Sequence, residues 1–228
     1  MLWCGMGRGR EGGGRYRHDI QGLRAVAVLI VVVFHTGVGL SGGFVGVDAF
    51  LVISGFVIAA LLRRELASTG TISLRGFYAR RIRRLLPSLS VMLVAVVLAA
   101  MLLESPLGRQ QSTVRTAIAA SFSGANLWLF ARGTGYFTPD ESANPLLHTW
   151  SLSIEEQFYL LLPALLLVLW RIDRRRSAGT PGFVPAAGLA LLGAASFALS
   201  CAFAYHLGPA MQVTDPERFG FYLLPTRV

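Results

Sequence analysis

The 228-residue sequence contains no lysine and few charged residues of any kind. Charged side chains make up 14% of the chain, against about 25% in an average soluble domain. Hydrophobic residues make up 54%, and the mean hydropathy is +0.56. This composition argues against an ordinary soluble enzyme and favours a chain that lies largely in lipid.

Cysteine is also scarce, since only Cys4 and Cys201 are present. Two cysteines so far apart define neither a disulfide framework nor a metal site, so we expect no bound metal and no bound cofactor. No alternating strand pattern survives among the long apolar runs. The expected fold class is therefore all-α, a polytopic helical bundle of an integral membrane protein.

Five apolar segments have the length that a helix needs to cross a bilayer core of about 30 Å. Pro87 stands in the first turn of the third segment, where proline is tolerated. A sixth segment, residues 116–130, is shorter and contains serine, glycine and asparagine. The five predicted crossings are residues 21–38, 44–62, 85–103, 151–170 and 185–206.

All 21 basic residues are arginines, and the net charge is +9. They stand in blocks beside the apolar segments, so the charge indicates membrane topology and no nucleic-acid partner is expected. Arginine-rich loops of membrane proteins stay in the cytoplasm. All blocks can be cytoplasmic only if the stretch between Leu103 and Ser151 holds an even number of crossings. We therefore expect residues 116–130 to be re-entrant or interfacial on the outer side of the membrane, and the N-terminus to be cytoplasmic.

The chain divides into a short tail and one membrane domain. Residues 1–19 are rich in glycine and arginine, which predicts a disordered cytoplasmic tail. Residues 20–228 hold the predicted crossings and form the membrane domain.

Two ionisable residues, Arg24 and His35, lie in the first predicted crossing. Ionisable groups in a membrane helix are costly and are functional candidates by default. Their spacing puts them on nearly the same helix face, about 16 Å apart along the axis. Alone, Arg24 is explained as a snorkelling anchor and His35 as a structural histidine. Together they predict a path from an anionic molecule inside to proton chemistry outside.

Acidic residues open two later crossings. Asp48 comes soon after His35 and can orient its imidazole. Glu155 and Glu156 begin the fourth crossing, where acids also suit a helix N-terminus. Glu155 shares one helical stripe with neighbouring polar residues, whereas Glu156 points elsewhere. A serine hydrolase is disfavoured, because that constellation is recognised by geometry and not by proximity in sequence.

A cluster of arginines follows the second predicted crossing, in a segment expected to be a loop. Topogenic charge and contact with anionic lipid are sufficient explanations. Clamping phosphate groups is a second use, for which the guanidinium group is well suited. The candidate donor-binding residues in this segment are Arg80, Arg81, Arg83 and Arg84.

Several ordered strings stand between about Tyr16 and Arg227. They are DIQGLR with His35, GGFVGVDAFLVISGF, FYARRIRRLLP, HTWSLSIEEQFYLLLP and FYLLPTR. With these strings the sequence resembles the acyltransferase-3 family of bacterial membrane-bound acyltransferases. The closest resemblance is to members with a fused SGNH-type domain outside the cytoplasm.

The resemblance implies roles for particular residues. Arg24 and His35 correspond to an arginine and a histidine held to be essential in the family. The arginine motif linked to acyl-coenzyme A binding maps to Arg80 and Arg83, or else to Arg81 and Arg84. The family continues with further helices beyond the last string, so this chain is expected to be a truncated, N-terminal part of its domain.

The expected function is transfer of an acyl group, most often acetyl, from cytoplasmic acyl-coenzyme A to a hydroxyl of an extracytoplasmic glycan or glycolipid, such as lipopolysaccharide or cell-wall glycan. His35 is the expected general base. The expected partners are the donor, the acceptor and membrane lipids, and the expected location is the bacterial inner membrane. The other candidate catalytic residues are Arg24, Asp48, Glu155 and Glu156.

Two alternatives remain open. One is a transporter-type protein with a polar relay, which inverted repeats would favour, although none is visible in the sequence. The other is a membrane fragment without catalytic activity.

Overall fold

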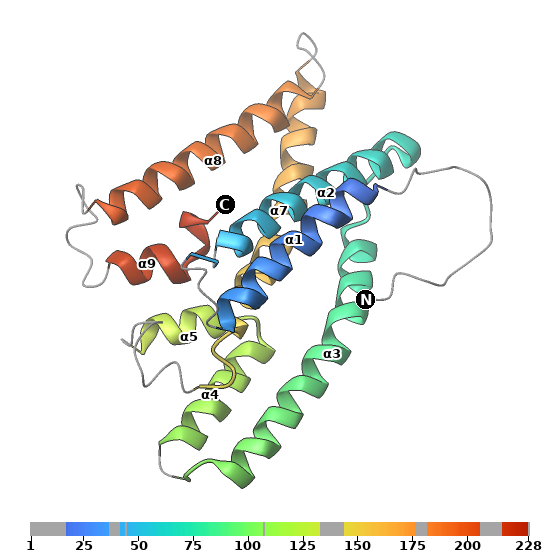
Figure 1. Ribbon diagram of the computed structural model, residues 1–228. Helices are drawn as coiled ribbons and strands as arrows, with labels where there is room; N and C mark the ends of the chain where they lie inside the picture. Colours follow the sequence, from blue (N-terminus) through green and yellow to red (C-terminus); the bar gives the residue numbers. More distant parts are fainter. Residues whose placement is uncertain are drawn as a thin grey trace.

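The computed structural model describes residues 17–36, 42–43, 45–106, 108–132, 144–176, 182–205 and 216–227. Within these ranges every regular element is a helix (Figure 1), which confirms the all-α fold class. The predicted disordered tail lies outside the described residues up to position 16. In chain order the elements are α1 (His18–His35), α2 (Val45–Thr69), α3 (Leu74–Leu103), α4 (Arg109–Ser121), α5 (Ala125–Ala131), α7 (Thr149–Arg175), α8 (Phe183–Ala204), α9 (Pro216–Tyr222) and the 3-10 helix η2 (Leu224–Thr226).

Four of these helices, α2, α3, α7 and α8, are long and apolar enough to cross a membrane. They match four of the five predicted crossings. The remaining prediction, residues 21–38, falls on α1, which ends at His35 and is not one of the four. That crossing stays a prediction.

The arginine-rich segment before the third crossing is helical, so the predicted loop is wrong there. α3 already begins at Leu74, because the Ser73 hydroxyl accepts a hydrogen bond from the Gly76 backbone nitrogen at 3.2 Å and caps the helix. Arginine, leucine and alanine are also strong helix formers. The true connection to α2 is short and contains Gly70, whose φ of +72° suits a glycine.

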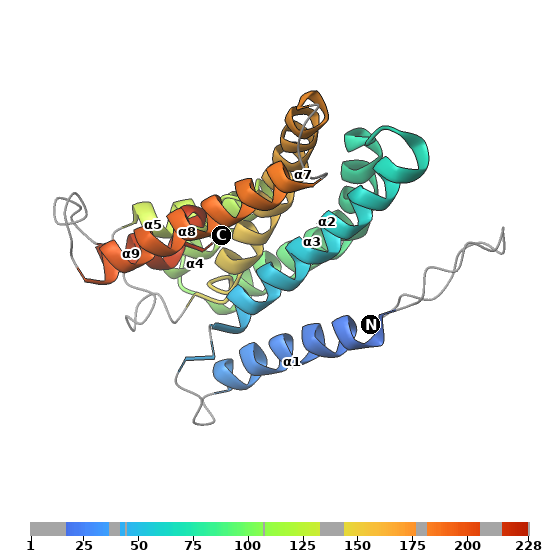
Figure 2. The same cartoon turned by 90° about the horizontal axis from the view of Figure 1, so that it is seen from above.

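The long helices α1, α2, α7 and α8 pack in that order, with α1 and α8 at opposite edges (Figure 2). α1 and α2 approach closely at Gly46. A Cβ atom there would lie 2.7 Å from the Ala27 carbonyl oxygen and 2.8 Å from the Val31 Cγ2. Small residues allow such close helix packing in membranes.

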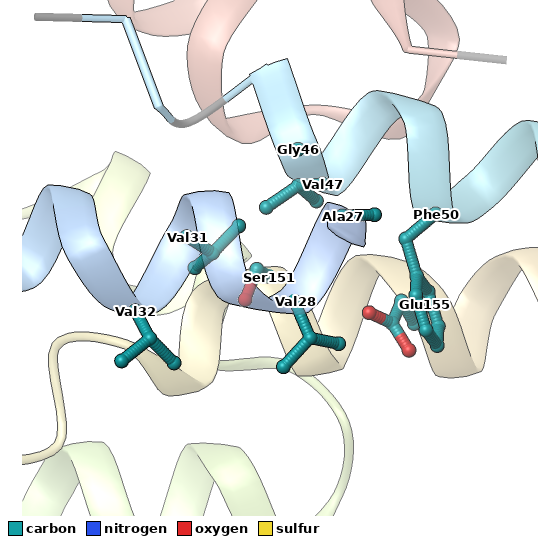
Figure 3. A pocket seen from close by; sticks show the side chains of 9 residues that line it. All are labelled: Ala27, Val28, Val31, Val32, Gly46, Val47, Phe50, Ser151 and Glu155. Carbon is teal, nitrogen blue, oxygen red and sulfur yellow. The ribbon is translucent and has the colours of Figure 1, made fainter. Parts of the chain in front are cut away.

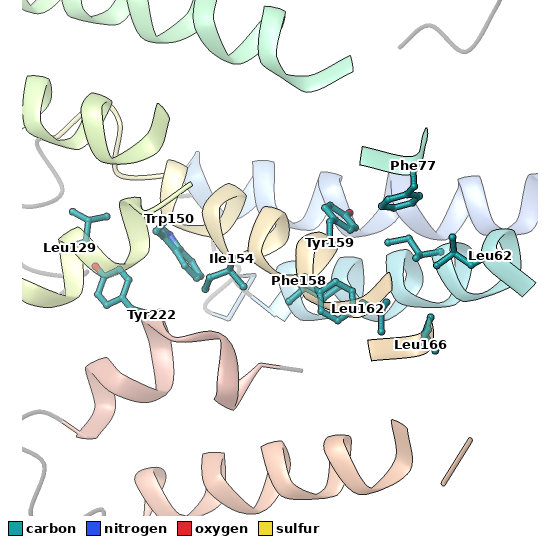
Figure 4. Packing of buried hydrophobic residues seen from close by; sticks show 12 residues of the cluster. Leu62, Phe77, Leu129, Trp150, Ile154, Phe158, Tyr159, Leu162, Leu166 and Tyr222 are labelled. Atoms are coloured by element: carbon teal, nitrogen blue, oxygen red, sulfur yellow. The ribbon is translucent and has the colours of Figure 1, made fainter. Parts of the chain in front are cut away.

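α7 is the central helix of the core (Figure 4). Its buried face meets side chains of α2, α3, α5 and α9, so the polar residues on α7 are held by packing on several sides. The buried cluster consists of Leu51, Ile58, Leu62, Phe77, Leu129, Trp150, Ile154, Phe158, Tyr159, Leu162, Leu166 and Tyr222.

The segment predicted to be re-entrant or interfacial falls on two short helices, α4 and α5, which have 13 and 7 residues. The bend between them includes Ser123, whose φ is +54°. Neither helix is among the four candidate spans. The placement of this segment at the outer membrane face stays a prediction.

Candidate functional site

A hollow of about 150 Å³ lies between α1, α2 and α7 (Figure 3). Its wall is mostly apolar and is open on one side, since Val28 and Val32 are 48% and 51% exposed. Its polar side chains, Ser151 and Glu155, stand one turn apart on α7. We call this space the acidic hollow. Its lining residues are Ala27, Val28, Val31, Val32, Gly46, Val47, Phe50, Ser151 and Glu155.

The wall contributed by α1 is the helix face that runs from Arg24 toward His35. Its four lining residues follow Arg24 at intervals of three, four, seven and eight positions, which is the spacing of one helical face. α1 is one unbroken helix up to His35, its last residue. The helical spacing from which a common face for Arg24 and His35 was predicted therefore applies to this part of the backbone. The His35 side chain lies outside the described part of the structure.

Arg24 lies at the N-terminal end of this stripe on α1, beside the acidic hollow. Its guanidinium carbon lies 4.8 Å from the centre of the Phe50 ring, and Phe50 itself lines the hollow. This cation–π contact fixes the head group against α2. Arg24 is therefore positioned where an anion at the end of the hollow would meet it.

Glu155 turns its carboxylate into the hollow, beside Phe50 (Figure 3). The guanidinium groups of Arg24 and Arg81 both attract this carboxylate. A carboxylate surrounded by apolar side chains and approached by two cations is a candidate for proton transfer.

Glu156, its neighbour, has a different environment. Its Oε1 accepts a hydrogen bond from Arg81 Nη2 at 3.3 Å, and the two side chains are 21% and 22% exposed. The same guanidinium lies over the Tyr159 ring, 3.1 Å from its centre. The Tyr159 hydroxyl donates to the Ser54 Oγ at 2.8 Å. Polar contacts thus link α3 and α7 to α2, and Glu156 is held in an ion pair.

The other three candidate arginines of α3 differ from Arg81. Arg80, Arg83 and Arg84 are all exposed, whereas Arg81 turns toward α7. The structure therefore brings neither proposed pair of arginines into the acidic hollow. Of the four arginines, only Arg81 faces α7, and the other three lie on the surface.

Asp48 pairs with an arginine that the sequence did not indicate as a site residue. Arg227 Nη1 donates to both carboxylate oxygens of Asp48, at 2.8 and 2.9 Å. Arg227 is 7% exposed and also lies near the rings of Trp150 and Phe221. The signal for it was its place in the last matching string, FYLLPTR. An orienting role of Asp48 toward His35 stays a prediction.

A hydrogen-bonded amide pair, buried Asn126 and half-buried Gln157, holds α5 against α7. Gln157 donates to the Asn126 Oδ1 at 2.9 Å, and Asn126 donates to the Tyr222 carbonyl oxygen at 3.0 Å.

Across the described ranges, no three histidine, cysteine, aspartate or glutamate side chains cluster as metal ligands would.

The sequence that forms this site belongs to a known class of membrane acyltransferase. Residues 17–189 match the acyltransferase domain of the acyltransferase-3 family, and the chain belongs to that family. It is 43% identical over 166 residues to a protein of Staphylococcus aureus strain MSSA476 named "Putative O-acetyltransferase SAS0844", an alignment that covers 71% of this chain and 26% of that protein.

A second relative is the O-acetyltransferase OatA of S. aureus strain NCTC 8325, which is 41% identical over 156 residues. That alignment covers 68% of this chain and 25% of OatA. The chain thus aligns with about a quarter of the length of these curated relatives. No solved structure is significantly similar to it.

Proposed function

We propose that the protein transfers an acyl group, most often acetyl, from cytoplasmic acyl-coenzyme A to a hydroxyl of an extracytoplasmic glycan or glycolipid at the bacterial inner membrane. Family membership supports acyl transfer, and the names of the relatives support O-acetylation. One observation carries the assignment of residues. Arg24, the wall of the acidic hollow and His35 follow one face of α1.

Arg24 binds an anionic part of the donor. Its guanidinium packs on Phe50, and a planar guanidinium can form paired hydrogen bonds to a phosphate group. The exposed arginines of α3 supply further positive charge for the nucleotide phosphates or for anionic lipid. These arginines are Arg80, Arg83 and Arg84.

His35 acts as the general base. During transfer the thioester C–S bond breaks, a new bond forms between the acyl carbon and the acceptor oxygen, and coenzyme A leaves as the thiol. One proton therefore moves from the acceptor hydroxyl to a base and finally to the thiolate. Glu155 faces the same hollow and is the second group able to carry this proton.

Asp48 and Glu156 have a positioning role in this scheme. Each carboxylate is paired with an arginine, Asp48 with Arg227 and Glu156 with Arg81. Each ion pair joins two segments of the chain, α2 with the residues after η2 and α7 with α3. Both residues therefore act through the helices that they join.

The test is thiol release from acetyl-coenzyme A by the full-length protein in liposomes, with a soluble glycan as acceptor. Loss of a general base typically costs about 10²–10⁴-fold in rate, and we expect this range for His35→Ala and for Arg24→Ala. Arg17→Ala is the matched control, because Arg17 is an exposed arginine just before the same helix. Unchanged release in His35→Ala or Arg24→Ala refutes the assignment.

A further inference from the structure

The end of α7 meets the turn between α2 and α3 at one end of the helix bundle. Arg174 Nη1 donates to the Gly70 carbonyl oxygen at 3.2 Å, which ties the last turn of α7 to that turn. Leu62 of α2, Phe77 of α3 and Leu166 of α7 belong to one buried cluster and lie close together at this end (Figure 4). The end of α2, the start of α3 and the end of α7 therefore form one region.

Positive charge dominates this region. Residues 61–84 contain seven arginines and one acidic residue, Glu65, and residues 169–176 contain four arginines and one acidic residue, Asp173. Both carboxylates accept hydrogen bonds from backbone N–H groups at the starts of α3 and α8, at 2.8 to 3.1 Å. Ten of the eleven arginines, all except Arg81, are exposed. We call these two stretches together the arginine end.

On α7 an exposed apolar helix face leads directly into arginines. Val168 and Ile172 are 50% and 41% exposed, and Arg171 and Arg175 follow Val168 at intervals of three and seven positions, which is the spacing of one face. Trp170 beside them is half-buried, and tryptophan is enriched at the membrane interface. Because α7 is long and apolar enough to cross a membrane, these arginines stand where lipid tails end and headgroups begin.

The same pattern recurs on α2. Val52 and Phe56 are 73% and 55% exposed, and the exposed Arg63 follows Val52 by eleven positions, which returns to within about 20° of the same face. A soluble anion needs no apolar neighbours, whereas a phospholipid carries a phosphate group and acyl chains in one molecule. The arrangement on both helices therefore fits a lipid.

We propose that the arginine end binds anionic phospholipids, whose phosphate groups pair with the guanidinium groups of Arg63, Arg171 and Arg175 while their acyl chains lie along the exposed faces of α2 and α7. A guanidinium can form paired hydrogen bonds to a phosphate group. Each arginine near an anionic lipid surface contributes about fivefold in affinity. Phosphatidylcholine also has a phosphate group, but its choline cation is repelled by neighbouring arginines.

This inference is independent of the proposed function, because it uses none of the candidate donor-binding arginines of α3. Native mass spectrometry of the full-length protein in neutral detergent tests it, with phosphatidylglycerol and phosphatidylcholine of the same acyl chains as the two ligands. We expect phosphatidylglycerol to bind about tenfold or more tightly than phosphatidylcholine. Equal affinities for the two lipids overturn the inference.

Coenzyme A serves as a soluble competitor that also carries phosphate groups. We expect it to leave the bound phosphatidylglycerol in place, since it has no acyl chains to lie along the apolar faces. Displacement of the lipid by coenzyme A would identify a site for soluble phosphates and would overturn the inference.

Two pairs of exposed arginines provide matched variants. Arg171→Gln combined with Arg175→Gln should weaken binding of phosphatidylglycerol by about tenfold or more and leave binding of phosphatidylcholine nearly unchanged. Arg109→Gln combined with Arg115→Gln removes the same charge from α4, which follows the far end of α3, about 45 Å along that helix. This second pair should leave both affinities unchanged. Equal effects of the two double variants contradict the proposal.

A salt titration of the unchanged protein covers the case in which the α7 variant does not fold. Exposed charges are screened as the ionic strength rises, so the preference for phosphatidylglycerol should fall several-fold between low and high salt. A preference that does not depend on salt overturns the inference.

Discussion

Arg227 and Asp48 are 179 positions apart in the sequence, yet one guanidinium nitrogen of Arg227 donates to both carboxylate oxygens of Asp48. Asp48 stands in the first turn of α2, two residues from Gly46 and Phe50, which line the acidic hollow. The ion pair therefore fixes the part of α2 that forms the wall of the site.

Replacing Arg227 by glutamine should destabilise the protein. Removing one partner of a fully buried ion pair costs about 3–5 kcal/mol. Because Asp48 is 37% exposed, we expect the free energy of unfolding to fall by about 2 kcal/mol instead. Thermal unfolding in detergent measures the change. Arg17→Gln breaks the exposed pair with Asp19 and should have no measurable effect, so equal shifts in the two variants would contradict the role of Arg227.

The hydrogen bond between Tyr159 and Ser54 should be visible in a double-mutant cycle. Tyr159→Phe leaves the Ser54 hydroxyl, which is 3% exposed, without this partner, and should cost about 1–2 kcal/mol. Ser54→Ala in the same chain removes the orphaned hydroxyl, so the double variant should be more stable than the sum of the single effects predicts. Strict additivity would show that the two groups do not interact.

Arg81 and Arg84 should respond differently to truncation, although they lie one turn apart on α3. Arg81→Ala leaves Glu156 unpaired at 21% exposure, and should lower the free energy of unfolding by about 2 kcal/mol. Adding Glu156→Gln should restore part of that loss. Arg84→Ala should leave thermal unfolding unchanged and raise the KM for acetyl-coenzyme A. A stability loss in Arg84→Ala would place that residue in the packing instead.

Gly46 should not tolerate a methyl group. The Cβ of Gly46→Ala would lie 2.7 Å from the Ala27 carbonyl oxygen, so α1 must move away from α2 at a cost of about 1–3 kcal/mol. Gly22 on α1 has nothing within 4 Å of such an atom, and Gly22→Ala should stabilise the helix by about 0.5–1 kcal/mol. Thermal unfolding of both variants tests the contrast, which fails if the two shifts have the same sign.

The helices of the fold were predictable because run length and hydropathy are local properties. Four predicted crossings coincide with α2, α3, α7 and α8, although α3 begins eleven residues before the predicted start. That difference has a local cause, since the arginines before Leu85 continue the helix out of the apolar run. Hydropathy marks where lipid begins, not where a helix begins.

The partners of charged residues were much less predictable. The sequence suggested His35 as the neighbour of Asp48, because the two are close along the chain. The pairing with Arg227 depends on how α9 and η2 pack against α7 and α8, which no local pattern encodes. Glu156 and Arg81 were both candidates, but the two residues of this ion pair are 75 positions apart in the sequence.

The helix face that lines the acidic hollow was predictable from the sequence, whereas the volume of the hollow was not. Helical periodicity placed Arg24 and His35 on one face of α1, and that face lines the hollow. Its volume depends on how closely α2 approaches, which the contact at Gly46 sets. The sequence contains several glycines in this region and does not distinguish the one that makes the contact.

The bend at Ser123 separates α4 from α5 and keeps each of them short. If residues 109–131 formed one straight helix, it would be about 34 Å long, enough for a crossing of about 30 Å. In the predicted topology, in which this segment does not cross, such a helix would add a crossing and place Arg174 on the opposite side of the membrane from Arg80. Because arginine-rich segments resist transfer across the membrane, the kink at Ser123 would keep the arginines of α3 and of α7 on one side.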